Sequence, residues 1–285
     1  MPDATNPVTL DDQELAEELT EAEKEDVHKR VPPRAVVVLE TIRAEGELEL
    51  HRPTAALALS GLAAGLSMGF SLVAMGAIRA ALPDAPWREL VVKLGYCVGF
   101  LIIVIGRQQL FTENTLTPVI PLLHNRDVAT FKRVCRLWGV VLVANLVGAF
   151  CFSLVVGRTH VFPVELRDQF AALAQQALAG SFGDQFLRAI FSGWLIALMV
   201  WLLPNADTSR VFVVVLLTYM IGIGQLSHIV AGSVEAFYAV VTGGAAFGHV
   251  VIGFIVPVLL GNLLGGGMLV GALHHAQIEA DKAHT

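Results

Sequence analysis

Charged residues are scarce in this sequence. They make up 15% of the 285 residues, and 55% of the chain is hydrophobic, whereas about 25% of a soluble globular domain is charged. The three cysteines lack metal-ligand spacing and are interpreted as small buried hydrophobes. Neither paired carboxylates nor a nucleophile spaced from a base can be recognised. These absences exclude a soluble domain and predict a polytopic membrane protein that is not an enzyme and has no metal site and no cofactor.

The charge that is present is concentrated near the N-terminus. Fourteen of the 25 acidic residues lie within the first 52, so the net charge of −6 belongs to a tail and does not indicate nucleic-acid binding. We therefore expect an acidic cytoplasmic tail over 1–52, a transmembrane domain over 53–275 and a cytoplasmic C-terminal tail over 276–285. Residues 35–50 mix apolar and charged side chains, which favours an interfacial helix docked on the bilayer over one that occludes a cytoplasmic opening.

The long apolar runs predict six membrane crossings, since a helix needs about 20 apolar residues to span a bilayer. Five runs are uncharged and are found at 53–78, 137–157, 189–206, 211–234 and 236–273. A sixth, at 94–106, ends at the polar sequence Arg107-Gln108-Gln109, and apolar character resumes at 116. We expect an all-α, multi-pass protein whose second and fifth crossings are broken.

Lysine and arginine in a short loop set the predicted orientation. The loop 124–136 carries four basic residues, Arg126, Lys132, Arg133 and Arg136, which places it in the cytoplasm. With six crossings, both termini then lie on the same cytoplasmic side. This orientation fits a multi-pass protein of a cell (inner) membrane.

The two halves of the apolar region resemble each other. Residues 144–149 (ANLVGA) match 261–266 (GNLLGG) at an offset of 117, and 109–112 (QLFT) align with 225–228 (QLSH) at an offset of 116. Three crossings per repeat is an odd number, so the halves must run through the membrane in opposite directions. Non-helical backbone survives in a bilayer only where it faces protein or a cavity. The two polar interruptions therefore predict a solute path at the pseudo-two-fold axis.

At these residues the chain resembles the formate/nitrite transporter family. The resemblance rests on Leu110-Phe111-Thr112-x-Asn114, on Asn145-Leu146-Val147-Gly148-Ala149, on His228, and on the long block from Pro257 to Gly271. It covers roughly residues 53 to 275. The resemblance implies an aquaporin-like fold of six helices, assembled as a homopentamer in a lipid bilayer, with one pore for small monovalent anions in each protomer.

The same resemblance assigns roles to single residues. Thr112 would point its hydroxyl into the pore from the break in the second helix, and His228, preceded by Ser227, would face it as the central histidine. Ungapped extension from these anchors puts Tyr96, Phe100 and Ile221 at the apolar constriction. We expect the pore to be lined by His228, Thr112, Leu110, Phe111, Asn114 and Ser227.

This chain also departs from the family. An acid usually precedes the central histidine and the Leu-Phe-Thr turn, and Ser227 and Gln109 stand there instead. The family's vestibule lysine aligns with Ser181. Arg107 and Glu113 flank the loop. Intramembrane charges usually compensate each other, so a structural pair of Arg107 with Glu113 or Glu235 is favoured over attraction of anions by Arg107.

The residues predict a transport mechanism and leave two alternatives open. Because desolvating a full charge costs far more than desolvating a neutral acid, an anion would take a proton near His228 and cross the constriction neutral. A neutral-solute pore is one alternative, although Asn-Pro-Ala boxes are absent from the sequence. A non-conducting sensor or assembly protein with the same fold is the other.

Overall fold

The computed structural model describes residues 20, 22–24, 35–271, 273 and 276. Most of the predicted N-terminal tail and the predicted C-terminal tail lie outside these residues. Within them the chain is helical and contains no strand. The elements run in the order α2 (Ala35–His51), α3 (Thr54–Ala81), α4 (Arg88–Val92), α5 (Cys97–Ile105), η1 (Glu113–Thr115), α6 (Val119–Asn125), α7 (Val128–Arg158), α8 (Val164–Ala177), α9 (Phe182–Leu202), η2 (Leu203–Asn205), η3 (Asp207–Ser209), α10 (Arg210–Ile223), α11 (Ile229–Thr242), α12 (Phe247–Val250), η4 (Val251–Ile255), α13 (Val256–Leu263) and η5 (Leu264–Gly271).

Four helices in the described part are long and apolar enough to cross a membrane. They span Thr54–Ala81, Val128–Arg158, Phe182–Asn205 and Phe247–Gly267, with mean hydropathy between 1.8 and 2.4. Two further apolar segments are interrupted, as the sequence predicts: α5 ends at Ile105 and α10 ends at Ile223, and non-helical backbone follows each. The all-helical multi-pass fold is confirmed. The count of six crossings and the opposed direction of the halves stay predictions.

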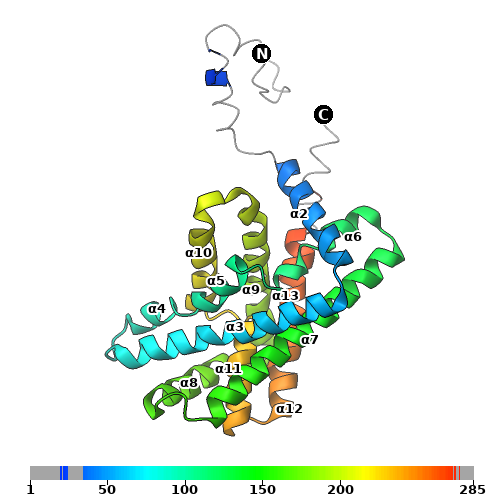
Figure 1. Cartoon of the computed structure of the whole chain (residues 1–285). Helices are drawn as coiled ribbons and strands as arrows, with labels where there is room; N and C mark the ends of the chain where they lie inside the picture. The colour runs from blue at the N-terminus through cyan, green and yellow to red at the C-terminus, as the bar shows by residue number, and fades with distance from the viewer. Residues whose placement is uncertain (1–19, 21, 25–34, 272, 274–275, 277–285) are drawn as a thin grey trace.

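Small residues bring the long helices together in pairs. In Figure 1, α3 and α7 lie against each other in the N-terminal half of α3 and diverge toward its C-terminal end. A Cβ added at Gly65 of α3 would overlap the backbone of Asn145 in α7, so the contact tolerates nothing larger than glycine. Gly261 and Gly265 lie equally close to the backbone of α9. Close backbone approach of this kind is how helices associate without a hydrophobic driving force.

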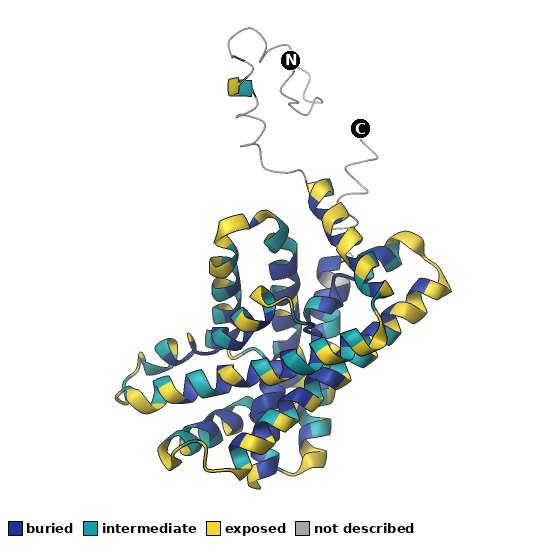
Figure 2. Cartoon of the chain, viewed as in Figure 1, coloured by how far each residue is buried: buried dark blue, intermediate teal, exposed yellow. Residues whose placement is uncertain are grey.

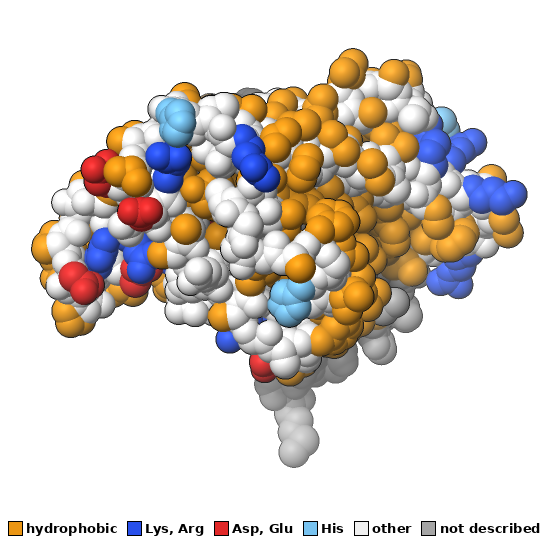
Figure 3. Space-filling view, turned by 90° about the horizontal axis from the view of Figure 1, so that it is seen from below, with side chains coloured by type: hydrophobic (Ala, Val, Ile, Leu, Met, Phe, Trp, Pro, Cys, Tyr) orange, Lys and Arg blue, Asp and Glu red, His pale blue; other side chains and the backbone are white. Residues whose placement is uncertain are grey.

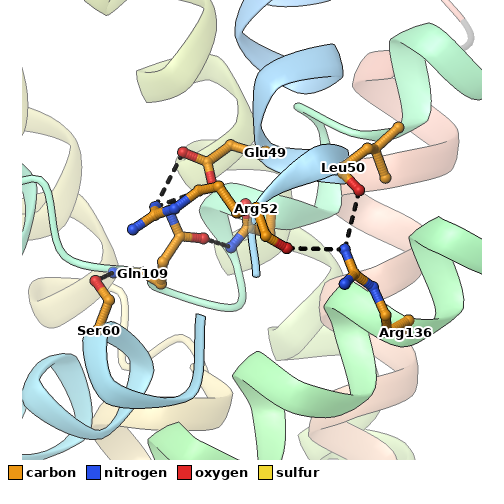
Figure 4. A network of polar contacts seen from close by, with 7 residues as sticks. Glu49, Leu50, Arg52, Ser60, Gln109 and Arg136 are labelled. Atoms are coloured by element: carbon orange, nitrogen blue, oxygen red, sulfur yellow. Dashed lines mark hydrogen bonds and ion pairs between the residues drawn. The ribbon is translucent and has the colours of Figure 1, made fainter. Parts of the chain in front are cut away.

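The helix α2 packs on protein through part of its apolar face, whereas we expected that face to meet the bilayer; contact of the rest of the helix with the bilayer stays a prediction. Its buried face, including Val38, Leu39 and Ile42, forms an apolar cluster with side chains of the α6 region and α9. The start of α7 is fixed by polar side chains. Asp127, just before α7, caps that helix and accepts hydrogen bonds from the hydroxyl and the backbone amide of Thr130, which lower the pKa of Asp127 below its ordinary value. Arg136 of α7 in turn donates to the carbonyls of Leu50 and Arg52 at the end of α2 (Figure 4).

The surface carries much apolar side-chain area, as a lipid-exposed protein requires. Figure 2 shows buried residues where the helices meet and exposed residues on their outer faces. On α7 these outer residues include Val143, Val147 and Val155, which are about half exposed. Seen from one end, the molecule shows wide hydrophobic areas with the charged side chains gathered toward its two sides (Figure 3). The exposed apolar faces agree with membrane localisation.

Candidate pore

The two breaks share one backbone geometry. Arg107 and Gln225 both have φ of 50°, a left-handed conformation that non-glycine residues seldom adopt. The next amide in each break, of Gln108 and of Leu226, donates 3.0 Å back to the carbonyl of Ile103 or Ile221. Such conformations persist only where the surroundings enforce them, and they cluster at functional sites.

These hydrogen bonds correct the register of the internal repeat. Arg107 corresponds to Gln225 at an offset of 118, whereas the sequence comparison predicts an offset of 116. Under the corrected register Leu110, and not Thr112, is the counterpart of His228. Thr112 and His228 are therefore partners across the centre of the molecule and do not occupy equivalent positions in the two halves.

A buried asparagine fastens the first break. The Oδ1 atom of Asn145, in α7, accepts from the amide of Phe111 at 2.8 Å. Its Nδ2 donates to the carbonyls of Gly61 at 2.7 Å and Gln109 at 2.9 Å. The side chain is fully buried, so these bonds satisfy backbone groups that would otherwise be stranded in an apolar interior.

A second asparagine performs the same task at the second break. Asn262, in α13, accepts from the amide of Ile229 at 2.9 Å and donates to the carbonyls of Ala189 and Ser227 at 2.8 and 3.2 Å. Each asparagine thus ties the break of its own half to two long helices. Both residues therefore form amide cross-links between a break and the helices beside it.

The two breaks meet at one side-chain hydrogen bond. Thr112 Oγ1 lies 2.8 Å from His228 Nε2, and both residues are at most 1% exposed. His228 also begins α11, where its Nδ1 accepts from the amides of Val230 and Ala231 at 3.3 and 3.2 Å. Since Nδ1 is an acceptor, the neutral ring carries its proton on Nε2, which donates to Thr112. The ring is oriented by its own helix and offers one N–H to the centre.

Aromatic side chains close the centre on one side of the histidine. The rings of Phe100 and His228 meet edge to face with centroids 5.0 Å apart, and Tyr96 lies 5.3 Å from Phe100. Phe100 and Ile221 are fully buried. The three residues predicted at the constriction therefore lie together in the core beside His228.

Two cavities flank this closed centre. One of about 600 Å³ is lined by Leu110, Asn114 and Arg107 together with residues of α2 and the end of α9. The other, of about 50 Å³, is lined by Tyr96, Ile221, Ser227 and His228, with Arg188 near the start of α9. The cavities thus lie toward opposite ends of α9, and Thr112 and Phe100, both 0% exposed, separate them. We call them the large and the small vestibule.

The charge pair predicted in the first break is not formed. Arg107 and Glu113 both line the large vestibule, but no ion pair joins them within the described residues, and Glu113 Oε1 has no hydrogen-bond partner there. A different ion pair is found at the end of α2, where Arg52 lies 3.0 Å from Glu49 (Figure 4). The amide of Gln109 donates to Ser60, and its side chain accepts from Asn114 at 2.8 Å.

Sequence reasoning missed three features of the small vestibule. Ser227 Oγ donates to Gln185 Oε1 of α9 at 2.5 Å, which gives the residue before His228 a fixed partner. Lys93 and Glu235, two charged residues that are 9% and 7% exposed, also line this cavity. The isolated charge of Lys93 at the edge of an apolar run, and of Glu235 between two apolar runs, is the signal that could have identified them.

The sequence of most of the described region decides the family. The model of the formate/nitrite transporter family matches residues 36–276. The chain belongs to this family. It is a family of channels and transporters and not of enzymes, and together with the four apolar helices it identifies the chain as a membrane protein.

Individual relatives agree with this assignment. Inner membrane protein YfdC of Escherichia coli (strain K12) is 40% identical over 255 residues, which is 90% of this chain and 82% of YfdC. Formate channel FocA of Haemophilus influenzae is 24% identical, covering 75% of this chain and 83% of FocA. Among solved structures, a pentameric formate channel with formate bound superposes with a TM-score of 0.66 at 23% identity, covering 79% of this chain and 97% of that one. An FNT family ion channel reaches 0.74 at 16% identity, covering 85% and 99%. These two likenesses show the fold.

Proposed function

We propose that the chain forms a membrane channel for small monovalent anions such as formate, nitrite or a similar weak-acid anion, moved together with a proton. The observation that carries this proposal is the Thr112–His228 hydrogen bond, which lies buried between the two vestibules. A passing anion can replace Thr112 as the acceptor of the Nε2 proton, since an anionic acceptor makes the stronger bond.

The closed centre explains why a proton is required. Phe100 and Ile221 present no polar atom to a solute, and desolvating a full charge there costs far more than desolvating a neutral acid. We infer that Nδ1 of His228 takes a proton from the aqueous side in place of its bonds from Val230 and Ala231, while Nε2 gives its proton to the anion, so that the ring ends neutral and the anion crosses the aromatic constriction as its neutral acid. Leu110 and Asn114 line the approach from the large vestibule, whereas Phe111, predicted to line it too, is buried with its ring against Trp138.

Assembly and orientation complete the proposal. A homopentamer is supported by the likeness to a pentameric formate channel and by the exposed apolar faces of the long helices. A location in the cell (inner) membrane is supported by the relative named as an inner membrane protein. Both termini face the cytoplasm, because basic residues gather at the start of α7, with Arg126 just before the helix and Lys132 and Arg133 in its first turns.

The test is anion flux in proteoliposomes that contain the full chain. Uptake of formate, nitrite, acetate and hydrosulfide is compared at about pH 5.5 and about pH 7.5, a range that brackets the ordinary titration of histidine. Uptake should be faster at the lower pH and should disappear in His228→Ala. His249→Ala, which changes an exposed histidine of α12, is the matched control and should conduct like the wild type.

Each other outcome has a definite meaning. Proton-linked flux that survives in His228→Ala would refute the role of the histidine while leaving the channel in place. No flux of any of the four anions from intact pentamers would favour a non-conducting sensor or assembly protein, and flux of glycerol in their place would favour a neutral-solute pore.

A further inference from the structure

Two oppositely charged side chains of the small vestibule act on each other electrostatically but form no direct ion pair in the described part of the chain. Lys93 follows α4, and Glu235 lies on α11, and both are more than nine-tenths buried. Within the described residues, neither side chain makes a hydrogen bond or an ion pair, although both line the cavity that contains His228. Buried charges are normally paired and hydrogen-bonded, because an unpaired one costs several kcal/mol. Glu235 balances the charge of Lys93 without contacting it, so an anion in the cavity would supply the direct contact that the Lys93 ammonium lacks.

The surrounding residues hold both groups toward one space. Glu235 follows His228 by seven residues, which is two helical turns, so the two share one face of α11. The stem of Lys93 packs on Gly222 of α10, where an added Cβ would come within 3.2 Å of Lys93 Cβ. This glycine leaves the room in which the lysine lies. Three different helical segments therefore converge on one cavity, which is what a built binding site requires.

The charge balance of this cavity selects an anion. Its lining has two basic residues, Lys93 and Arg188, against the single acid Glu235. The large vestibule has the opposite excess, with four acids against three arginines. A cavity needs roughly 10–15 Å³ for each water, so about 50 Å³ accommodates a ligand the size of a few waters. That volume suits formate or acetate and not a large organic anion.

We propose that the small vestibule is a binding site for one small monovalent carboxylate, whose charge is held by the Lys93 ammonium beside His228, with Glu235 as the counter-charge that keeps the site weak enough to release it. This inference rests on the proposed function, because the ligand is the ion that would be transported. It adds the residue that recruits the ion. Glu235 competes with the carboxylate for Lys93, so the two residues have opposite effects on affinity.

Equilibrium binding of radiolabelled formate to the purified, detergent-solubilised full chain tests the proposal. In Lys93→Gln the dissociation constant should rise about tenfold or more, the usual consequence of losing a hydrogen bond to a charged group. In Glu235→Gln it should fall several-fold. Arg79→Gln is the matched control. Arg79 lies in the last turn of α3 and does not line the cavity, so the substitution removes a charge but should leave binding unchanged.

A double variant separates recognition from a structural role. Lys93→Gln with Glu235→Gln leaves no lone buried charge, so it should fold even where Lys93→Gln does not, and it should bind formate as weakly as Lys93→Gln. A merely structural pair predicts the reverse, with both single variants impaired and the double variant restored to wild-type binding. That result would overturn the proposal.

Binding and flux measured together distinguish this inference from the proposed function. Formate flux that depends on His228 but is indifferent to Lys93, with unchanged binding in Lys93→Gln, refutes the recruiting site alone. Lys93-dependent binding without flux supports the site and refutes the channel. Absence of formate and acetate binding in the wild type overturns the inference.

Discussion

Replacing Asn145 by alanine should destabilise the protein far more than the loss of one ordinary side-chain hydrogen bond. The substitution strands the amide of Phe111 and the carbonyl of Gln109, whereas the carbonyl of Gly61 keeps its intrahelical bond in α3. An unsatisfied buried polar group costs about 1–3 kcal/mol, so two of them cost about 2–6 kcal/mol. Water from the large vestibule can reach Gln109, which it lines, so we expect a value toward the lower end, about 3 kcal/mol.

The assay is thermal unfolding of the detergent-solubilised protein followed by tryptophan fluorescence. A loss of about 3 kcal/mol corresponds to a fall in Tm of about 6–12 °C at this chain size. Asn114→Ala is the matched control, because that buried side chain donates to the side chain of Gln109 alone and strands no backbone group. It should cost about 1 kcal/mol. Equal losses of Tm in the two variants would refute the argument that Asn145 holds the backbone of the break.

Two further substitutions test the helix α2 and the constriction. Ile42→Asp puts a carboxylate into the apolar cluster under α2 and should release that helix at a cost of about 3 kcal/mol or more. Limited proteolysis should then cut α2 faster than in Leu48→Asp, which changes a 72% exposed residue. Equal cleavage rates in the two variants would contradict the packing of α2 on the protein. Phe100→Ala opens the wall beside His228, so flux of acetate should rise relative to formate in proteoliposomes, whereas an unchanged ratio would place the constriction elsewhere.

The sequence predicts the two broken helices because polarity inside an apolar run has few structural explanations. The contact between Thr112 and His228 was implied by the family resemblance and not by that pattern. The sequence comparison did not predict the correct register of the repeat. Matching Gln109 with Gln225 aligned identical side chains, whereas the breaks are fixed by backbone conformation at Arg107 and Gln225, which have nothing in common as side chains. Identity between short polar segments therefore gave an offset that is two residues too small.

The sequence did not predict the packing of α2 or the charged residues of the small vestibule, for a different reason. The amphipathic pattern of 35–50 is the same whether the apolar face meets lipid or α9, so composition alone favours the wrong surface. Lys93 and Glu235 are 142 positions apart in the chain, and only the tertiary fold brings both to one cavity. Long-range convergence of single charged residues leaves no local pattern to detect.

The asparagine cross-links support the backbone of the pathway and leave the side chains at its centre free of that task. Asn145 and Asn262 hold the backbone of the breaks, and neither bonds to Thr112 or to the ring of His228. An ion that displaces Thr112 from the ring exchanges one side-chain hydrogen bond and leaves every backbone cross-link intact. Under the proposed mechanism, passage through this centre needs rotation of side chains and no rocking of helices on the scale of microseconds to milliseconds. Turnover would thus be limited by how often a proton and an ion arrive together, and not by how fast the protein can change shape.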